Sequence, residues 1–352
     1  MKKHLILIIA SFLSYQLLAC TTFSFSDAEG HRVFGRNFDF PVGMGHIQVN
    51  YRNMHKTAFI RPPEKAMSWI SKYGSISFNQ CGREFPYGGM NEAGLVVEQM
   101  WLEESVYPEA DVRYGLTELQ WIQYQLDNSA TVAEIIASDS LIRVSYTSVA
   151  PLHFLVSDAG GDVATIEYLE GKMVVHRGEN LPCPALANST YEHSLKYKQY
   201  MDSDQSRDQE WTGNTSGRFA KAASMIEAYS QDQDIVEYSF SILNSVSQGP
   251  GTQWSIVYDL TELMVYYKST QNEAMQKIEL ADFDFSCSGV PLFVDLSETI
   301  IGAESFHELS YKDNYDLIES VINGVDFLKN TVPRAAIEAS ARYAESVNCQ
   351  GD

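Results

Sequence analysis

The chain has 352 residues, of which 45% are hydrophobic, and its 25 Lys and Arg against 46 Asp and Glu give a formal net charge of −21 at pH 7. This length and apolar content suit one large globular domain or two closely joined ones. The acidic balance disfavours nucleic acid and anionic membrane surfaces as partners, because binding to phosphates requires clustered Lys and Arg. We interpret the charge as keeping the protein soluble.

The first nineteen residues have the pattern of an export signal. Two lysines near the start precede an apolar stretch over residues 5–18, and Ala19 supplies the small residue that a signal peptidase requires. The stretch is too short and too interrupted for a membrane span, which needs about 20 apolar residues. We therefore predict a signal peptide over residues 1–19, a single domain over residues 20–352, and a location in the periplasm or outside the cell.

Beyond the signal, strands and helices are predicted in separate blocks. Phe23 and Phe25 alternate with polar residues before the turn sequence DAEG, which predicts an N-terminal hairpin. The predicted strands lie in residues 21–26, 31–40, 153–178 (three strands) and 252–270 (a hairpin). The predicted helices lie in residues 116–137, 191–201, 218–229, 315–328 and 333–347, with a polar surface loop at 202–215. This order favours an α+β fold of layered antiparallel sheets with helices outside, and not a Rossmann fold.

Five cysteines follow the predicted signal: Cys20, Cys81, Cys183, Cys287 and Cys349. They lie far apart, with no C-x-x-C pair and no His at metal-ligand spacing, so we predict no metal site. Because five is odd, at least one thiol has no partner within the chain. Up to two disulfides are expected among the last four cysteines in an oxidising compartment, and their pairing stays open.

Cleavage between Ala19 and Cys20 would place a thiol and a free α-amine on one residue. The amine titrates at about 7.7–8.0 in model compounds, so it can act as the general base for the thiol without a histidine. Antiparallel pairing would bring Arg36 and Asp39 alongside Cys20, where the arginine favours the thiolate and the carboxylate orients the amine. A surface ion pair between Arg36 and Asp39 is the alternative interpretation.

The residues LLAC at 17–20 are also compatible with a lipobox. In that case the cysteine sulfur receives diacylglycerol and its amine receives an acyl chain, which blocks both groups that catalysis needs. The signal therefore leaves two alternatives. The protein is either an enzyme with a free Cys20 or a lipid-anchored binding protein without catalytic activity.

The sequence CTTF at 20–23, followed by GRNFDF at 35–40, resembles the start of the choloylglycine hydrolase family. That family includes the penicillin V acylases and bile salt hydrolases, within the N-terminal nucleophile (Ntn) hydrolase superfamily. GGMNEAGLVVEQMW at 88–101, ANSTYE at 187–192 and TSGRF at 215–219 resemble later motifs in the same order. The resemblance implies a four-layer αββα sandwich of two antiparallel sheets between helical layers. It also implies an amidase that hydrolyses linear amide C–N bonds through a thioester and needs no cofactor.

The resemblance further implies roles for six residues. Cys20 would be the nucleophile and Arg36 and Asp39 would position it. Asn188 and the backbone N–H of Trp101 would hold the oxyanion, and Arg218 would complete the electrostatics. The substrate would be a small N-acyl amide of the penicillin V, conjugated bile acid or N-acyl homoserine lactone type, and the assembly a homotetramer.

The sequence departs from the best-known branches of the family at two places. At the position of Trp101, bile salt hydrolases carry Asn and Gram-positive penicillin V acylases carry Tyr, and residues 41–59 match the substrate loop of neither branch. We therefore carry over the reaction but not the substrate.

Several of these residues also have an ordinary structural interpretation. Asn188 could cap a helix and Arg218 could pair with a surface carboxylate. Phe38, Phe40 and Tyr87 could line an apolar acyl pocket or belong to the core. The sequence leaves these alternatives open.

Overall fold

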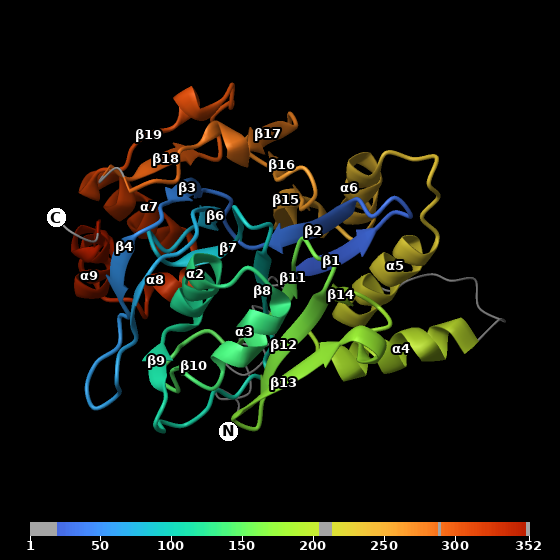
Figure 1. The fold of residues 1–352 in the computed structure, drawn as a ribbon, viewed down its shortest axis with the longest axis horizontal. Helices are drawn as coiled ribbons and strands as arrows, with labels where there is room; N and C mark the ends of the chain where they lie inside the picture. The colour runs from blue at the N-terminus through green and yellow to red at the C-terminus, as the bar shows by residue number, and fades with distance from the viewer. Residues whose placement is uncertain (1–19, 204–212, 288–289, 350–352) are drawn as a thin grey trace, which may run out of the picture.

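Two antiparallel β-sheets face each other between layers of helices, which confirms the predicted αββα architecture (Figure 1). The computed structural model describes residues 20–203, 213–287 and 290–349. The predicted signal peptide, residues 1–19, and most of the predicted polar loop lie outside these ranges.

The first sheet contains the predicted N-terminal hairpin and has the strand order β14-β1-β2-β15-β16-β17. The strands are β14 (Ala185–Leu186), β1 (Thr21–Ser26), β2 (Arg32–Asp39), β15 (Thr252–Asp259), β16 (Met264–Ser269) and β17 (Gln276–Glu279). Because β1 lies between β2 and β14, residues at its start have neighbours on both sides.

The second sheet has the strand order β13-β12-β11-β8-β7-β6-β3-β18-β19. Its strands are β13 (Lys172–Arg177), β12 (Val163–Leu169), β11 (Leu152–Ser157), β8 (Val96–Trp101), β7 (Pro86–Asn91), β6 (Ser75–Asn79), β3 (His46–Asn50), β18 (Leu292–Asp295) and β19 (His307–Glu308). Two small sheets accompany it, formed by β20 (Asn348–Cys349), β4 (Met54–Thr57) and β5 (Ser68–Ile70), and by β9 (Tyr114–Leu116) with β10 (Ile142–Val144).

Helices cover the outer face of each sheet (Figure 1). The helices are α2 (Glu118–Asn128), α3 (Val132–Ser138), α4 (Tyr191–Ser203), α5 (Thr215–Glu227), α6 (Ile235–Ser245), α7 (Tyr311–Gly324), α8 (Asp326–Lys329) and α9 (Arg334–Tyr343). Helices α5 and α6 pack on the first sheet, and α2 packs on β7 and β8 of the second. In the described residues, these helices are too short or too polar to cross a bilayer.

Aromatic side chains fill the space between the two sheets. The ring of Phe78 in β6 lies 6.1 Å from that of Trp254 and 6.3 Å from that of Tyr258, both in β15. All three are at most 1% exposed. Full burial of a side chain of this kind stabilises the fold by about 1.5–3 kcal/mol, so this layer contributes much of the driving force for sheet packing.

The observed elements differ from the predicted ones where tertiary contacts or caps intervene. The single helix predicted over 116–137 is two helices, because the Thr131 hydroxyl accepts from the backbone N–H of Glu134 and starts α3 anew. The last helix ends at Tyr343, and the chain after it pairs with β4 as β20. Helix α6 was not predicted, and neither were strands β3 to β7, β9, β10, β14 and β17 to β19.

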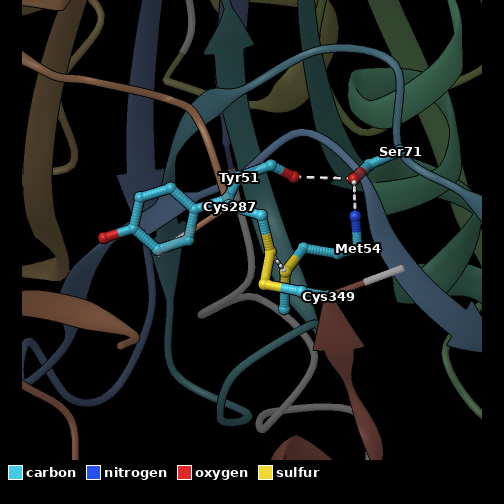
Figure 2. The surroundings of a disulfide bond; sticks show 5 residues. All are labelled: Tyr51, Met54, Ser71, Cys287 and Cys349. Carbon is cyan, nitrogen blue, oxygen red and sulfur yellow. Dashed lines mark hydrogen bonds between the residues drawn. A yellow bond between two sulfur atoms is a disulfide. The ribbon is translucent and has the colours of Figure 1, made fainter. Parts of the chain in front are cut away.

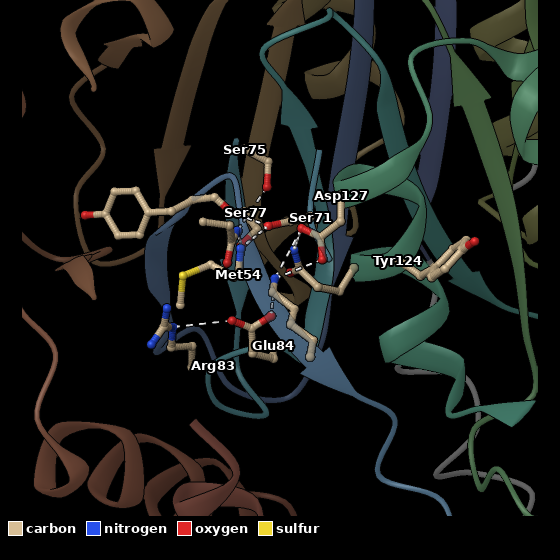
Figure 3. A network of polar contacts seen from close by, with 12 residues as sticks. Met54, Ser71, Ser75, Ser77, Arg83, Glu84, Tyr124 and Asp127 are labelled. Atoms are coloured by element: carbon tan, nitrogen blue, oxygen red, sulfur yellow. Dashed lines mark hydrogen bonds and ion pairs between the residues drawn. The ribbon is translucent and has the colours of Figure 1, made fainter. Parts of the chain in front are cut away.

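A buried charge cluster joins the β20-β4-β5 sheet to α2 (Figure 3). The Lys56 ammonium in β4 lies 2.6 Å from the Glu84 carboxylate and 2.9 Å from that of Asp127 in α2. Asp127 also accepts from Trp69 Nε1 at 2.7 Å, and burial raises its pKa to about 6. Because breaking a buried ion pair costs about 3–5 kcal/mol, the cluster fixes the place of this small sheet.

A disulfide attaches the C-terminal segment to the rest of the domain. Cys349 of β20 is bonded to Cys287, 62 positions earlier in the chain (Figure 2). The hydroxyl of Tyr343 donates to the backbone oxygen of Thr57 at 2.7 Å and adds a second attachment. The remaining three cysteines, Cys20, Cys81 and Cys183, are free. One disulfide therefore forms, within the limit that the sequence predicts.

We predict that Cys349→Ala lowers the free energy of unfolding by about 2–4 kcal/mol, because the open chain gains conformational entropy in the unfolded state. The measurement is urea unfolding of the oxidised protein and the variant. Reductant should destabilise the wild type to the level of the variant and leave the variant unchanged. A wild type that is insensitive to reductant would contradict the prediction.

Candidate active site

The pairing of β1 with β2 places the predicted site residues around Cys20. Thr22 pairs with Arg36 and Thr21 with Asn37. Side chains alternate between the faces of a sheet, so Thr22, Arg36 and the cysteine face the second sheet. The contact of the Thr22 hydroxyl with the Met100 sulfur of β8 confirms this side, since β8 belongs to the second sheet.

The Cys20 thiol lies between a guanidinium and the end of β2. Its Sγ is 3.9 Å from Arg36 Nη2 and 4.0 Å from the backbone oxygen of Asp39. Cys20 is 5% exposed. Burial raises the pKa of the thiol, and the positive charge of Arg36 acts in the opposite direction. The thiol therefore depends on nearby charges to become a thiolate.

Asp39 holds a buried carboxylate beside this thiol. Oδ1 accepts from the Thr252 hydroxyl at 2.5 Å, whereas Oδ2 is buried and has no hydrogen-bond partner among the described residues. Burial raises the pKa of Asp39 to about 6, while the Thr252 hydrogen bond and the charges of Arg218 and Arg36 oppose the rise. A buried oxygen without a donor is costly, so the site favours a donor at Oδ2.

Arg218 and Asn188 contact each other on the side of β1 that faces β14, away from β2. Arg218 Nε donates to the Thr21 hydroxyl at 3.1 Å, and its Nη2 donates to Asn188 Oδ1 at 3.1 Å. Asn188 Nδ2 in turn donates to the backbone oxygen of Trp101 at 2.9 Å. Thr22 pairs with Leu186 of β14, so two further steps of that register bring Asn188 level with Cys20.

A buried imidazole and carboxylate support the strand end that carries Asn188. His153 Nε2 donates to the backbone oxygen of Ala187 at 2.6 Å, and His153 Nδ1 lies 3.1 Å from Glu167 Oε1. Glu167 also accepts from the backbone N–H of Tyr191, the first residue of α4. These contacts fix the backbone on both sides of Asn188. Sequence reasoning assigned no role to His153 or Glu167.

The structure thus brings all six predicted site residues together. Cys20 contacts Arg36 and Asp39, and Asn188 contacts Arg218 and Trp101. The hydrogen bond from Arg218 to Thr21, the residue after Cys20, connects the two groups. Neither surface interpretation holds for the charged residues, because Arg36 and Asp39 are 1% exposed and Arg218 is 4% exposed. Asn188 binds Arg218 and Trp101 instead of capping α4. In the described residues, no cluster of His, Cys, Asp or Glu is arranged to hold a metal.

Comparison with known proteins identifies the family. The family model for linear amide C–N hydrolases of the choloylglycine hydrolase family matches residues 20–301. The chain belongs to this family. It is accordingly a hydrolase of linear amide C–N bonds, and the resemblance predicted from the sequence motifs is confirmed.

Relatives within the family support the same conclusion. The chain is 28% identical over 267 residues to a penicillin V acylase of Pectobacterium atrosepticum, covering 64% of this chain and 70% of the relative. It superposes on the penicillin V acylase of Agrobacterium tumefaciens with a TM-score of 0.72 and 27% identity, covering 83% of this chain and 98% of that structure. A mutant of the conjugated bile acid hydrolase of Clostridium perfringens shares the fold, with a TM-score of 0.63, 18% identity and coverage of 84% and 98%.

The aromatic residues near the site form part of the core of this amidase. The Phe38 ring lies 4.3 Å from Trp254, 5.3 Å from Phe40 and 5.4 Å from Tyr87, measured between centroids. All four side chains are at most 9% exposed. They pack on one another, in agreement with the core interpretation.

Sequence reasoning also missed two groups that contact site residues, the half-buried Thr252 and the fully buried Glu98. Thr252 binds Asp39, and Glu98 of β8 binds Arg36. Glu98 did leave a signal, because it is the one charged residue in the apolar run LVVEQMW. A charge inside a buried strand requires a buried partner.

We predict that the stability contributed by Asp39 falls as the pH rises from about 4 to about 6. The folded-state pKa of about 6 exceeds the ordinary 3.8, so the folded protein binds more protons than the unfolded chain in this window. The full effect is about 3 kcal/mol, and Asp39→Asn should abolish it. Urea unfolding at pH 3.5 and pH 7 measures this change in stability. The protein used keeps one residue ahead of Cys20, so that no free α-amine lies beside Asp39. Equal pH dependence in both proteins would refute the prediction.

Proposed function

We propose that this protein is an exported amidase whose nucleophile is Cys20, freed when residues 1–19 are removed. The observation that carries the proposal is the position of the Cys20 sulfur between Arg36 and Asp39, at the first residue that the family model matches. Removal of the preceding residues creates an α-amine on the same residue, and that amine supplies the general base.

The unsatisfied Oδ2 of Asp39 supports this maturation. It is buried without a donor in the chain in which Cys20 is still joined to residue 19. A free α-amine on Cys20 would be a donor in the vicinity of this carboxylate. The amine–carboxylate contact would also favour the ionised form of Asp39.

In the proposed reaction, the amine accepts the thiol proton as Sγ attacks the amide carbonyl carbon. The C–N bond then breaks, the leaving nitrogen takes the proton back from the amine, and the acyl group remains on Cys20 as a thioester. Water attacks the thioester, its proton passes to the amine, and the acid leaves as the thiol is restored. Arg36 favours the thiolate throughout, because its guanidinium lies 3.9 Å from the sulfur.

Asn188 and the backbone N–H of Trp101 are the proposed donors for the tetrahedral oxyanion. Asn188 is half-buried at the level of Cys20, and its amide is held by two hydrogen bonds, from Arg218 and to Trp101. Preorganised donors of this type contribute about 3–4 kcal/mol to catalysis. Arg218 fixes the orientation of the Asn188 amide and adds positive charge near Asp39.

The proposed substrate is a small N-acyl amide with an apolar acyl group. Its range includes penicillin V, conjugated bile acids and N-acyl homoserine lactones. The half-buried Trp101 beside Asn188 offers an aromatic contact for the acyl group. A panel of these amides, assayed for release of the amine, would establish the preference.

Two observations support export of a free enzyme. The Cys287–Cys349 disulfide suits an oxidising compartment such as the periplasm or the exterior. The Cys20 thiol faces Arg36 and Asp39, so a diacylglyceryl group on its sulfur would have to displace both contacts. This arrangement favours the enzyme over the lipid-anchored binding protein.

We predict that Cys20→Ser lowers kcat/KM at least 10³-fold and keeps the fold, because the hydroxyl is a much weaker nucleophile than the thiolate. Amine release from the best amide of the panel measures activity, and circular dichroism and urea unfolding measure the fold. Cys183→Ser is the matched control, since Cys183 is also free and also 5% exposed. Full activity of Cys20→Ser would defeat the proposal, and the control should retain most activity.

We predict that the exported protein begins at Cys20 with an unmodified amine and thiol. Intact mass and N-terminal sequencing of material secreted by the native host measure this. The mass of residues 20–352 supports the amidase. A mass increased by a diacylglyceryl group and an acyl chain would support the lipid-anchored alternative instead.

A further inference from the structure

A buried carboxylate from the opposite sheet holds the active-site arginine. Glu98 in β8 is 0% exposed, and its Oε2 forms an ion pair with Nη1 of Arg36 in β2. Arg36 Nη1 also donates to the backbone oxygen of Tyr87 at 3.1 Å. Its Nη2 donates to the Cys20 sulfur. The guanidinium therefore has one nitrogen anchored on the second sheet and another directed at the thiol.

The second carboxylate oxygen of Glu98 accepts a hydrogen bond from another buried residue. Its Oε1 accepts from the Tyr258 hydroxyl at 2.6 Å, and Tyr258 is 0% exposed in β15. Burial raises the pKa of Tyr258, so the phenol keeps its proton and remains a donor. Gly88 lies opposite Glu98 in β7, where a Cβ would come within 2.4 Å of both carboxylate oxygens. The space for this carboxylate exists because residue 88 has no side chain.

Because the Arg36 guanidinium is buried, it depends on partners within the protein and not on water. Arg36 Nε has no hydrogen-bond partner among the described residues, so Glu98 and Tyr87 are the anchors of the guanidinium on this side. A buried arginine without a counter-ion costs several kcal/mol. Without Glu98 the guanidinium would lose its charged anchor on the second sheet, and the Cys20 sulfur and the Asp39 carboxylate would be the groups left to attract its charge.

We infer that Glu98 is a positioning residue of the amidase: it holds Arg36 against the Cys20 sulfur and limits how strongly the arginine favours the thiolate. The inference rests on the proposed function of Cys20 and adds a residue to it. Tyr258 supports Glu98 by sharing its negative charge through the hydrogen bond. Glu98 does not touch the sulfur, so it acts through Arg36.

Among the residues that the structure describes, the charged and titratable groups around this thiol and Arg36 come from five elements. They are Arg36 and Asp39 on β2, Glu98 on β8, Tyr258 on β15, Tyr87 on β7 and Arg218 on α5. The free α-amine of Cys20 joins them in the processed protein. The conservative variants Glu98→Gln and Tyr258→Phe leave the rest of this set in place, so differences between their profiles report the altered residue.

The test is the pH dependence of Cys20 alkylation by iodoacetamide in the processed protein, with the labelled cysteine located by peptide mass spectrometry. Glu98→Gln keeps an acceptor for Arg36 but removes the charge. Its alkylation midpoint should shift to lower pH by about one unit, because the full charge of Arg36 then favours the thiolate. Tyr258→Phe concentrates the charge on Glu98 and should shift the midpoint to higher pH. Glu98→Ala removes the anchor and should lower kcat at least tenfold.

The matched control is Glu64→Gln. Glu64 forms a similarly buried ion pair with Arg143, at a distance of 2.5 Å, and this pair is not part of the set of groups around Cys20. That variant should lose stability without moving the midpoint. An unshifted midpoint in Glu98→Gln, or a shift to higher pH, would overturn the inference. If Glu98→Gln does not fold, the opposite shift expected of Tyr258→Phe decides.

The alkylation profile is read from the thiol, so it tests Glu98 whether or not an amide is turned over. Absence of turnover by the wild type would contradict the proposed function alone.

Discussion

The antiparallel alternation of β1 and β2 is the constraint on which the site depends. Because neighbouring residues of a strand face opposite sides, Arg36 points between the sheets while Asn37 donates to the Leu243 backbone oxygen of α6. Cys20 lies where both environments meet, with Arg36 on the inner side and Asp39 at the strand end. A slip of one residue in this register would move every one of these side chains to the wrong face.

The same two strands explain why charges can be buried at the site. Arg36 lies between the two sheets and is shielded from water. The carboxylate of Glu98 in the opposite sheet therefore balances its charge. Asp39 lies near Arg218 and Arg36, which offset part of the cost of its burial. The site therefore consists of opposite charges beside a core of packed aromatic side chains.

The C-terminal segment of the chain extends beyond the residues that the family model matches. The family match covers residues 20–301 and establishes a linear amide C–N hydrolase. The C-terminal helix α9 and strand β20 lie beyond that range, and the Cys287–Cys349 disulfide attaches them to the matched domain. This addition packs against β4, whose lysine belongs to the buried cluster with Glu84 and Asp127.

Local sequence was sufficient for the hairpin, the three strands of 153–178 and most helices, because their apolar periodicity and turn residues act within a few positions. It also predicted the six site residues, since the motifs carry them in order along the chain. The roles of Glu98, Tyr258 and Thr252 came only from the tertiary structure, as did the disulfide pairing. These residues lie between 62 and 213 positions from the partners they bind, and only the packing of the two sheets and the return of the C-terminal segment bring them together.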